Sequence, residues 1–293
     1  MCALTCALNL AAVSFVTSHG VGRRRQQSRK PRTVTNPSPK VVVVVPTYNE
    51  RDNLPKLVQA LEALRMPALH LLVVDDNSPD GTGDVADQLV NDSAIPISVL
   101  HRLEKDGLGR AYVAGISRAL ADGADIVVQM DADLSHPADV IPAFIHTLTT
   151  TDAAVVLGSR YVAGGSVADD WAWHRKALSA GANFYVNAIL RLRVKDATAG
   201  FKAWHAATLT EIDVLSIQSN GYAFQVEMNY RTVRRGMRIV EVPIRFEERT
   251  EGASKMSLGV QLESALMPWK LLLKRAELGG ASQNAARGVR MER

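Results

Sequence analysis

The sequence predicts an α/β fold in which a mostly parallel, doubly wound sheet is flanked by helices. Short apolar runs rich in β-branched residues, such as the five valines at residues 41–45, alternate with segments whose leucines recur at helical spacing, such as residues 54–64. Such runs are typical of strands buried on both faces of a parallel sheet. Strands that alternate with helices require right-handed crossovers. The 293 residues and 47% hydrophobic content suffice for one large domain or two small ones.

Each expected element has its own local signal. Pro46 closes the first strand in a sharp turn, and the second strand runs into a loop dense in turn residues. We expect strands at residues 41–45, 70–74, 97–100, 126–130 and 154–157, and helices at residues 54–64, 109–120 and 171–192. Farther along, we expect short strands and one helix within residues 196–204, 221–227 and 238–246.

We expect a single domain over residues 40–256, between chain ends of different composition. Residues 1–39, rich in Arg, Ser and Pro, are predicted to be a disordered basic tail, and residues 279–293 a flexible tail. Residues 257–278 are predicted to form an amphipathic helix, which Pro268 should bend. Its apolar face has basic residues beside it, and this pattern suits equally a helix in a membrane interface and a helix packed on a core.

The net charge of +4 is misleading, because residues 1–40 contain seven basic residues and no acidic one. The remaining chain has 27 basic and 30 acidic residues, which argues against binding to nucleic acid. Both cysteines, Cys2 and Cys6, lie in the tail, so we expect no disulfide framework, no cysteine metal site and a reducing, cytosolic setting. The apolar stretch at residues 2–16 is too short for a spanning helix, and its positive charges follow it, unlike those of a signal peptide.

Polar residues follow three predicted strands at the point where each strand ends. Asp131 and Asp133 come after residues 126–130, and residues 46–50 and 75–78 follow the first two strands. The carboxyl ends of parallel strands form the sheet edge at which ligands bind. Two carboxylates there suit Mg²⁺ or Mn²⁺ shared with substrate phosphates, although an isolated Asp-x-Asp is more often a solvated turn. The three segments together suit a nucleoside diphosphate, which metal and cations must hold because the sequence has no glycine-rich phosphate loop.

Six ordered motifs resemble those of one enzyme family. They are Pro-Thr-Tyr-Asn-Glu at 46–50, Asp-Asp-Asn-Ser-Pro-Asp-Gly-Thr at 75–82, Gly-Leu-Gly-Arg-Ala-Tyr at 107–112, Asp-Ala-Asp-Leu-Ser-His-Pro at 131–137, Gly-Ser-Arg-Tyr at 158–161, and the set Arg249, Gly252, Ser254 and Lys255. Over about residues 40–260 the chain resembles the inverting nucleotide-sugar glycosyltransferases of the GT-A fold, and most closely the polyprenol-phosphate (dolichol-phosphate) mannosyltransferases. The order and spacing of the motifs make the resemblance specific.

The resemblance implies a reaction and a donor site. It implies transfer of mannose, with inversion, from GDP-mannose to a polyprenyl monophosphate. It also implies that Asp131 and Asp133 hold the metal, with Ser135 as a weaker candidate ligand, because some relatives have Gln at that position. The implied residues around the donor are Pro46, Tyr48, Glu50, Val74, Asp76, Asp131, Ala132 and Asp133.

The negative charge of both substrates requires cations. A divalent ion and fixed guanidinium groups stabilise a departing diphosphate, and Arg160, Arg249 and Lys255 fit that role. Arg175 and Ser179, one helical turn apart, would bind the acceptor phosphate from a common helix face. The alternative for any single arginine is a solvated surface charge. The predicted catalytic residues are Asp133, Arg160 and Arg249.

Three further residues near the motifs have no firm assignment. His136 is more typical of a packed or capping histidine than of a ligand, and Gln225 is left uncommitted. Glu227 is either a pocket residue or a helix cap. A phosphate monoester is already largely ionised at pH 7, so we expect the acceptor to need no general base, and Glu227 is the rival for that role.

We expect an enzyme that is peripheral at the cytoplasmic face of a membrane. The expected partners are GDP-mannose, a polyprenyl monophosphate lipid, the membrane surface and, as a candidate, a membrane-anchoring partner protein, with Mg²⁺ or Mn²⁺ as cofactor and no nucleic acid. One alternative is a UDP-glucose-dependent polyprenyl-phosphate glucosyltransferase, because nothing in residues 46–76 reads guanine over uracil. Another is a non-catalytic GT-A-like subunit that binds lipid or a partner, although such a subunit would not need both metal carboxylates.

Overall fold

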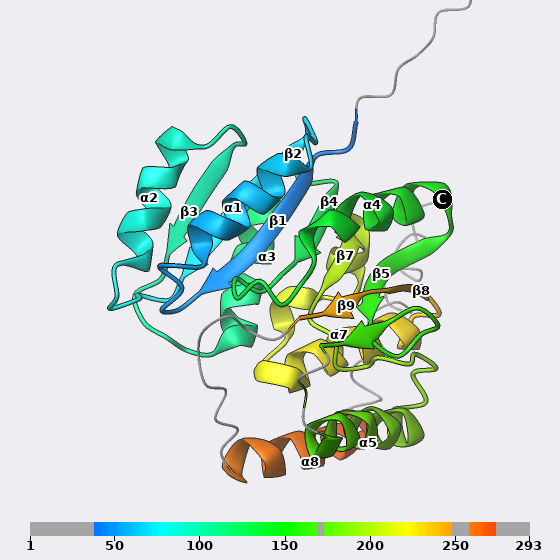
Figure 1. Ribbon diagram of the computed structural model, residues 1–293. Coiled ribbons are helices and arrows are strands. Elements are labelled where there is room, and N and C mark those ends of the chain that lie inside the picture. Colours follow the sequence, from blue (N-terminus) through cyan, green and yellow to red (C-terminus); the bar gives the residue numbers. More distant parts are fainter. Residues whose placement is uncertain (1–37, 169–170, 172, 248–257, 274–293) are drawn as a thin grey trace, which may run out of the picture. The chain divides into compact units, whose positions relative to one another are not determined.

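The computed structural model describes residues 38–168, 171, 173–247 and 258–273 (Figure 1). The strands are β1 (Val41–Thr47), β2 (Leu69–Asp75), β3 (Ile97–His101), β4 (Ile126–Gln129), β5 (Ala153–Ser159), β6 (Ser166–Val167), β7 (Lys202–His205), β8 (Arg238–Pro243) and β9 (Arg245–Phe246). The α-helices are α1 (Leu54–Ala63), α2 (Thr82–Asp92), α3 (Leu108–Ala121), α4 (Ile141–Thr150), α5 (Trp173–Leu190), α6 (Ala206–Glu211), α7 (Gly221–Arg234) and α8 (Leu258–Leu273). Two short 3₁₀ helices are η1 (Ala138–Val140) and η2 (Val214–Ser216). The predicted tails lie outside the described residues, apart from residues 38 and 39.

The main sheet is mostly parallel, as the sequence predicted. Its strand order is β3-β2-β1-β4-β7-β5-β8, and only β7 runs antiparallel to its neighbours. All five strands predicted over residues 41–157 are present in it, and β7 and β8 complete it. A second, small sheet pairs β6 with β9. The expected doubly wound arrangement is therefore confirmed, with one reversed strand inserted between β4 and β5.

Helices cover both faces of the main sheet, because the side chains of its strands alternate between two apolar clusters. In β1, Val41, Val43 and Val45 face a cluster that includes buried residues of α1 and α4. Val42 and Val44 face the opposite cluster, which includes residues of α3 and α7. Figure 1 shows α1 and α4 in front of the strands and α3 behind them. The run of valines is thus explained by burial on two sides.

A third apolar cluster joins α5, α7 and α8. Val186 of α5, Val226 of α7 and Leu271 of α8 are all buried in it. Leu266, Trp269 and Leu273 of the same helix are exposed. The helix is described over Leu258–Leu273 and packs on the domain through other residues, among them Met267.

The sequence analysis missed several helices. It did not predict α2. Only Thr82 and Ala86 of this helix are buried, so its sequence has no clear apolar face. It also missed α4 and the short α6. Of the three later segments in which short strands and one helix were expected, residues 221–227 lie within α7, which ends at Arg234.

A lysine lies inside the main sheet. Lys202 of β7 is fully buried, between Gln129 of β4 and Leu157 of β5. Its Nζ donates a hydrogen bond of 3.0 Å to the main-chain oxygen of Gln225 in α7. Burial lowers the pKa of Lys202 to about 7, although the charge of Asp196 opposes the shift.

We predict that Lys202 makes the stability of the fold depend on pH. Below pH 7 the lysine is protonated in both the folded and the unfolded chain, so the folded state bears the full cost of the buried charge. Between its folded pKa of about 7 and its ordinary value of 10.5 the folded chain binds fewer protons, so the free energy of unfolding rises with pH. Relative to Lys202→Met, the wild type should gain up to about 1.4 kcal/mol per pH unit from pH 7 to 9.

Urea unfolding of both proteins at several pH values measures this difference. Lys195→Met, which removes an exposed lysine seven positions earlier, is the matched control. A difference between Lys202→Met and wild type that stays constant over this range would contradict the prediction.

Candidate active site

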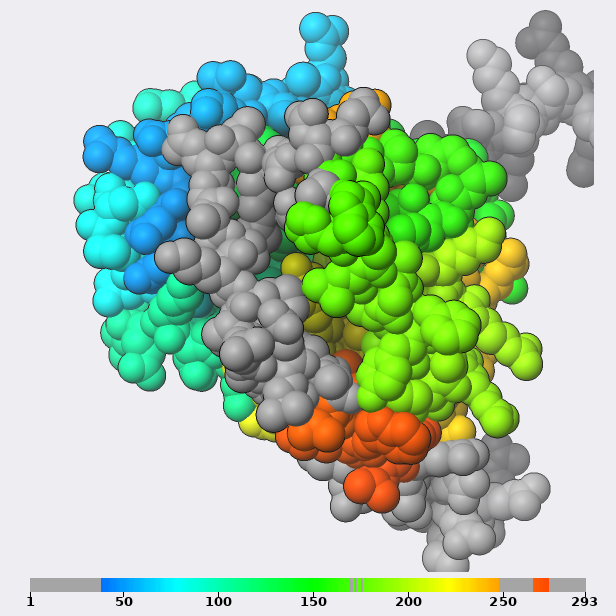
Figure 2. All heavy atoms as spheres, turned by 60° about the horizontal axis from the view of Figure 1, so that its bottom comes forward, coloured from blue at the N-terminus to red at the C-terminus, as the bar shows by residue number. Residues whose placement is uncertain are grey.

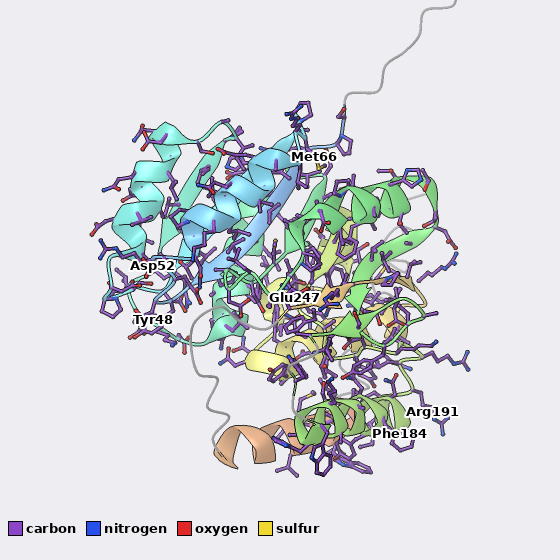
Figure 3. All side chains as sticks on the ribbon, viewed as in Figure 1. Tyr48, Asp52, Met66, Phe184, Arg191 and Glu247 are labelled. Atoms are coloured by element: carbon purple, nitrogen blue, oxygen red, sulfur yellow. The ribbon has the colours of Figure 1, made fainter. Side chains whose placement is uncertain are left out.

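The carboxyl ends of β1, β2 and β4 lie next to one another at one edge of the main sheet. β1 is the middle strand of the three, and its parallel register sets Thr47 beside Asp75 of β2 and Val44 beside Gln129 of β4. The three polar segments that follow these strands therefore start from one edge, as predicted. Figure 3 shows Tyr48 at this edge, and Met66, which precedes β2, at the opposite one.

Asp131 follows β4 and is held by two neighbouring side chains. The hydroxyl of Tyr112 in α3 donates to its Oδ1 at 2.8 Å, and its own main-chain N–H donates to Nδ1 of His136 at 3.1 Å. Burial, and then the charge of Asp131, raise the pKa of Tyr112 well above its usual value, so this phenol stays a donor. His136 is stacked on Phe201, in agreement with the prediction of a packed histidine. Among the described residues, none donates a hydrogen bond to Oδ2 of Asp131.

Asp133 is fixed within its own loop. Its Oδ1 accepts hydrogen bonds from the main-chain N–H of Ser135 at 3.1 Å and from the Ser135 hydroxyl at 2.6 Å. The turn between them is tight, because Leu134 has a φ of +62°. Ser135 is fully buried. Ala132, which stands between the two aspartates in the sequence, packs into the apolar cluster on the α1 and α4 side of the sheet. Ser135 thus contacts Asp133 directly, through both its main-chain N–H and its hydroxyl.

The acids at the end of β2 have different partners. Asp75 is tied to the surrounding loop, since its Oδ1 accepts hydrogen bonds from the Ser78 hydroxyl at 2.6 Å and the Thr47 hydroxyl at 3.2 Å. Asp76 forms an ion pair with Arg102, which follows β3. Burial raises the pKa of Asp76, and the Arg102 guanidinium opposes that rise. Of the two acids, Asp75 therefore supports the loop, and Asp76 with Arg102 forms a charged pair at the edge.

The residues predicted around the nucleoside divide into exposed and buried ones. Tyr48 is partly exposed, and the Nζ of Lys105 lies 3.5 Å from the centre of its ring, a cation–π contact. Glu50 accepts a hydrogen bond of 2.8 Å from Asn53, and Pro46 is partly exposed. The side chain of Val74 is buried under α3, so this residue has only its backbone to offer a nucleoside.

Arg160, which follows β5, is bound to Asp196. Its main-chain N–H, Nε and Nη2 all donate to the Asp196 carboxylate, the two side-chain bonds at 2.7 Å, and Nη2 also donates to Thr198 at 3.0 Å. Burial lowers the pKa of Arg160, but the hydrogen bonds and charge of Asp196 reverse the effect and raise it. Among the described residues, none accepts a hydrogen bond from Nη1. The guanidinium is therefore held by Asp196 along the edge formed by Nε and Nη2, and Nη1 lies on its other edge.

The two residues predicted to bind the acceptor phosphate, Arg175 and Ser179, belong to α5. Ser179 accepts a hydrogen bond of 2.7 Å from the hydroxyl of Tyr161, the residue after Arg160. This bond connects α5 to the Gly-Ser-Arg-Tyr motif at residues 158–161. The backbone of Arg175 lies in α5, one turn before Ser179. Arg249 and Lys255 lie outside the described residues.

Gln225 and Glu227, left unassigned by the sequence, have different surroundings. Gln225 is buried. Gly200 lies between it and the β4 loop, because a Cβ atom at Gly200 would be 3.7 Å from Nε2 of Gln225 and 3.8 Å from Oδ2 of Asp131. Gln225 is therefore close to that loop. Glu227 is in the interior of α7 and forms an ion pair with Arg231 at 2.6 Å, so of the two alternatives left open for it the helix cap does not apply. Its other oxygen accepts a hydrogen bond from Ser219.

Sequence reasoning missed four residues that shape this edge. Tyr112 closes the motif at residues 107–112, so its position in the matched pattern was an available signal. Arg102 and Lys105 follow β3 and had no motif to mark them. Asp196 is 36 positions from Arg160, and only the folded chain shows that the two residues meet.

A match to a protein-family model covers most of this domain. The model is "Glycosyl transferase family 2", and it matches residues 42–211.

Among the described residues, no helix combines the length and the apolar character that crossing a membrane requires.

Three curated relatives are similar over most of the chain. It is 41% identical over 236 residues to "Polyprenol monophosphomannose synthase" of Mycolicibacterium smegmatis, covering 80% of this chain and 88% of the relative. It is 45% identical over 227 residues to "Undecaprenyl-phosphate mannosyltransferase" of Micrococcus luteus, covering 78% and 91%. It is 37% identical over 220 residues to "Dolichol-phosphate mannosyltransferase" of Pyrococcus furiosus, covering 74% of this chain but only 59% of that protein.

Solved structures show a similar fold. A complex of glucosyl-3-phosphoglycerate synthase from Mycobacterium tuberculosis with UDP is similar with a TM-score of 0.58 and 19% sequence identity. The similarity covers 83% of this chain and 80% of that chain. A complex of the same enzyme with Mn²⁺, UDP-glucose and phosphoglyceric acid also has a TM-score of 0.58 and the same coverage. The sheet and its helices therefore form a GT-A-like fold. Together with the match over residues 42–211 and the similarity to the curated relatives, this fold shows that the chain belongs to glycosyl transferase family 2.

Proposed function

We propose that this glycosyltransferase transfers mannose, with inversion, from GDP-mannose to a polyprenyl monophosphate. The observation that carries the proposal is the carboxylate pair Asp131 and Asp133, held at the end of β4 beside the loops that follow β1 and β2. The names of relatives up to 45% identical support the sugar and the lipid acceptor. GDP as the nucleotide rests on the resemblance of the motifs alone.

The carboxylate pair suits a divalent ion such as Mg²⁺ or Mn²⁺. Carboxylate oxygens are the ligands that such hard cations prefer, and one or two carboxylates with substrate phosphates form a common site. Tyr112 and Ser135 orient the two carboxylates, as outer residues commonly do at metal sites. Bound there, the ion would stabilise the negative charge of the departing diphosphate.

Fixed cations complete the leaving-group site in this proposal. The free edge of Arg160 would donate to the diphosphate, and Asp196 would hold the guanidinium in place before the substrate arrives. Arg249 and Lys255 are proposed to add positive charge to the same group. Tyr48 and Asp76 are proposed to bind the nucleoside, together with Pro46, Glu50 and the backbone of Val74.

The acceptor supplies its own nucleophile. A phosphate monoester has a second pKa near ~6, so it is largely dianionic at pH 7 and needs no base. We propose that Arg175 and Ser179 of α5 position this phosphate. Because the acceptor is a lipid, we propose that the enzyme works peripherally, at the cytoplasmic face of a membrane, either unaided or with an anchoring partner protein.

One assay decides between this function and its rivals. Purified protein is incubated with polyprenyl phosphate, Mn²⁺ and each of a panel of labelled nucleotide sugars, and the label that becomes extractable into organic solvent is measured. Label from GDP-mannose supports the proposal. Label from UDP-glucose alone would support the glucosyltransferase, and no transfer from any donor would support a non-catalytic subunit.

We predict that turnover requires a divalent ion and both carboxylates. Asp133→Ala should lower kcat by at least ~10², because the diphosphate then departs without its metal. Excess chelator should abolish wild-type activity, and added Mn²⁺ should restore it. Asp139→Ala, which removes an exposed acid six positions later, is the control. Full turnover in chelator would contradict the metal role.

We predict that Arg160 and Asp196 act as one unit. Arg160→Ala and Asp196→Asn should each lower kcat, by roughly 10² for the arginine, with little change in the KM for the lipid. The double variant should be no slower than Arg160→Ala, because Asp196 acts through the arginine. Steady-state kinetics with both substrates varied test this, and thermal unfolding checks that each variant folds. Additive losses in kcat would show that the two residues act separately.

We predict that no side chain serves as an essential general base. Glu227 is already engaged by Arg231 and Ser219, so Glu227→Gln should retain most of kcat if the variant folds. Free polyprenol should not be mannosylated, because a hydroxyl needs a base. Product formation with the phosphate and with the free alcohol measures both points. Appreciable transfer to the alcohol, or complete loss of turnover in a folded Glu227→Gln that still binds donor, would overturn the base-free reaction.

A further inference from the structure

A small gap next to Asp131 is bordered by Gly200, which stands two residues before β7. The antiparallel register of β7 with β4 sets Lys202 opposite Gln129, and two residues farther along it brings Gly200 beside Asp131. A Cβ atom at Gly200 would contact three side chains, at 3.6 Å from Cε1 of His136, 3.7 Å from Nε2 of Gln225 and 3.8 Å from Oδ2 of Asp131. These are ordinary contact distances, so the missing side chain leaves room for a group the size of a methyl. We call this space, bordered by His136, Gln225 and Asp131, the Gly200 gap.

Gln225 of α7 brings a buried amide to the Gly200 gap. Gln225 is 3% exposed, and among the described residues none donates a hydrogen bond to its Oε1. Polar atoms that are buried without a partner are uncommon in folded proteins, so this amide needs an explanation. Figure 2 shows only a few yellow atoms of the part of the chain that contains α6 and α7, set back behind the green atoms around them. The main-chain oxygen of Gln225 accepts the hydrogen bond from Nζ of Lys202, which ties α7 to β7 two residues after Gly200.

The Gly200 gap lies between the two groups that are proposed to act on the diphosphate. Gly200 is partly exposed, so the gap is within reach of solvent. Two residues earlier, the hydroxyl of Thr198 accepts a hydrogen bond of 3.0 Å from Nη2 of Arg160. One short segment thus runs from Arg160, the proposed cation, to Asp131, a proposed metal ligand. A sugar bonded to the diphosphate must lie close to this segment.

The segment that forms the gap is fixed from two helices. The main-chain oxygen of Ala197 accepts a hydrogen bond of 2.9 Å from Asn229 of α7. The main-chain N–H of Thr198 donates one of 3.3 Å to Asn183 of α5, and both asparagines are buried. The gap therefore has a fixed size, and a side chain added at Gly200 would occupy it.

A sugar hydroxyl suits the Gly200 gap better than the acceptor phosphate does. A hydroxyl both donates and accepts hydrogen bonds, so it can accept one from Nε2 of Gln225 and donate one to an oxygen beside it. An ionised phosphate has only acceptors, and in the gap it would also meet the negative charge of Asp131. The neutral group is therefore favoured.

We propose that Gly200 and Gln225 recognise the sugar of the donor, with one sugar hydroxyl in the Gly200 gap and Nε2 of Gln225 donating a hydrogen bond to it. The inference rests on the proposed function, because it takes the diphosphate to lie at Asp131 and Arg160. It deepens that function, which assigns no residue to the sugar. It does not depend on the base, so it applies to GDP-mannose and to UDP-glucose alike.

Gly200→Ala tests the gap. Gly200 does not have a positive φ, and the added methyl would meet no described atom closer than 3.6 Å, so the variant should keep the wild-type Tm. Calorimetric titration of the whole protein with Mn²⁺, without acceptor, measures Kd for GDP and for GDP-mannose. Kd for GDP should stay within ~2-fold and Kd for GDP-mannose should rise at least ~10-fold, because the methyl and the hydroxyl cannot share the gap. Gly181→Ala, which adds a methyl in the open on α5, is the control and should change neither value.

Gln225→Leu tests the hydrogen bond with a side chain of similar size. Since none of the described residues donates to Oε1, the apolar replacement leaves no donor unpaired, and Tm should stay close to that of the wild type. Kd for GDP-mannose should rise roughly 5-fold with Kd for GDP unchanged, as expected for the loss of one hydrogen bond between neutral groups. Deoxy analogues of GDP-mannose, each without one hydroxyl, identify the group in the gap, because one of them should bind wild type and Gln225→Leu equally.

Three results would overturn the inference. The first is an unchanged Kd for GDP-mannose in both variants. The second is an equal loss for GDP and GDP-mannose, which would assign the gap to the diphosphate. The third is an effect confined to the KM for polyprenyl phosphate, which would assign it to the acceptor. If wild type transfers glucose from UDP-glucose instead, the same comparison is made with UDP and UDP-glucose, so a wrong donor is distinguishable from a wrong sugar site.

Discussion

The parallel pairing of β1 with both β2 and β4 is the constraint on which the site depends. β1 is buried on both faces, and its register with the two neighbours sets three carboxyl ends at one edge of the sheet. Each end is followed by a polar loop that could not form inside the sheet. A shift of one residue in this register would turn the alternate valines to the wrong faces, so the core and the position of the loops are fixed together.

Residues that the sequence did not single out hold Asp131 and Arg160 in place in the structure. Tyr112 comes from α3 and donates to Asp131, and Asp196 from the segment before β7 grips Arg160 along one edge. Groups oriented in this way cost little reorganisation when charge develops on a leaving diphosphate. The reversed strand β7 follows this segment, and its first residue, Lys202, is buried in the sheet. The supports are therefore as much a part of the site as the acids themselves.

Local patterns allowed much of this to be predicted, and long-range contacts account for the rest. The strands β1, β2 and β4 could be predicted from their apolar runs, and the polar ends of these strands from the acids and turn residues that follow. Both signals are local, because each extends over only a few consecutive residues. The reversal of β7 and the pairing of Arg160 with Asp196 join distant segments that no local pattern connects. The C-terminal helix was ambiguous because its spacing shows which residues share a face, but not whether that face meets α7 or solvent.

The most direct test of the account is anomalous diffraction from crystals of the protein grown with Mn²⁺ and GDP. The account predicts one strong manganese peak bounded by the carboxylates of Asp131 and Asp133, with the diphosphate on its open side and the nucleoside over the loops that follow β1 and β2. A manganese ion bound elsewhere, or a nucleotide bound away from the carboxyl ends of these strands, would contradict it.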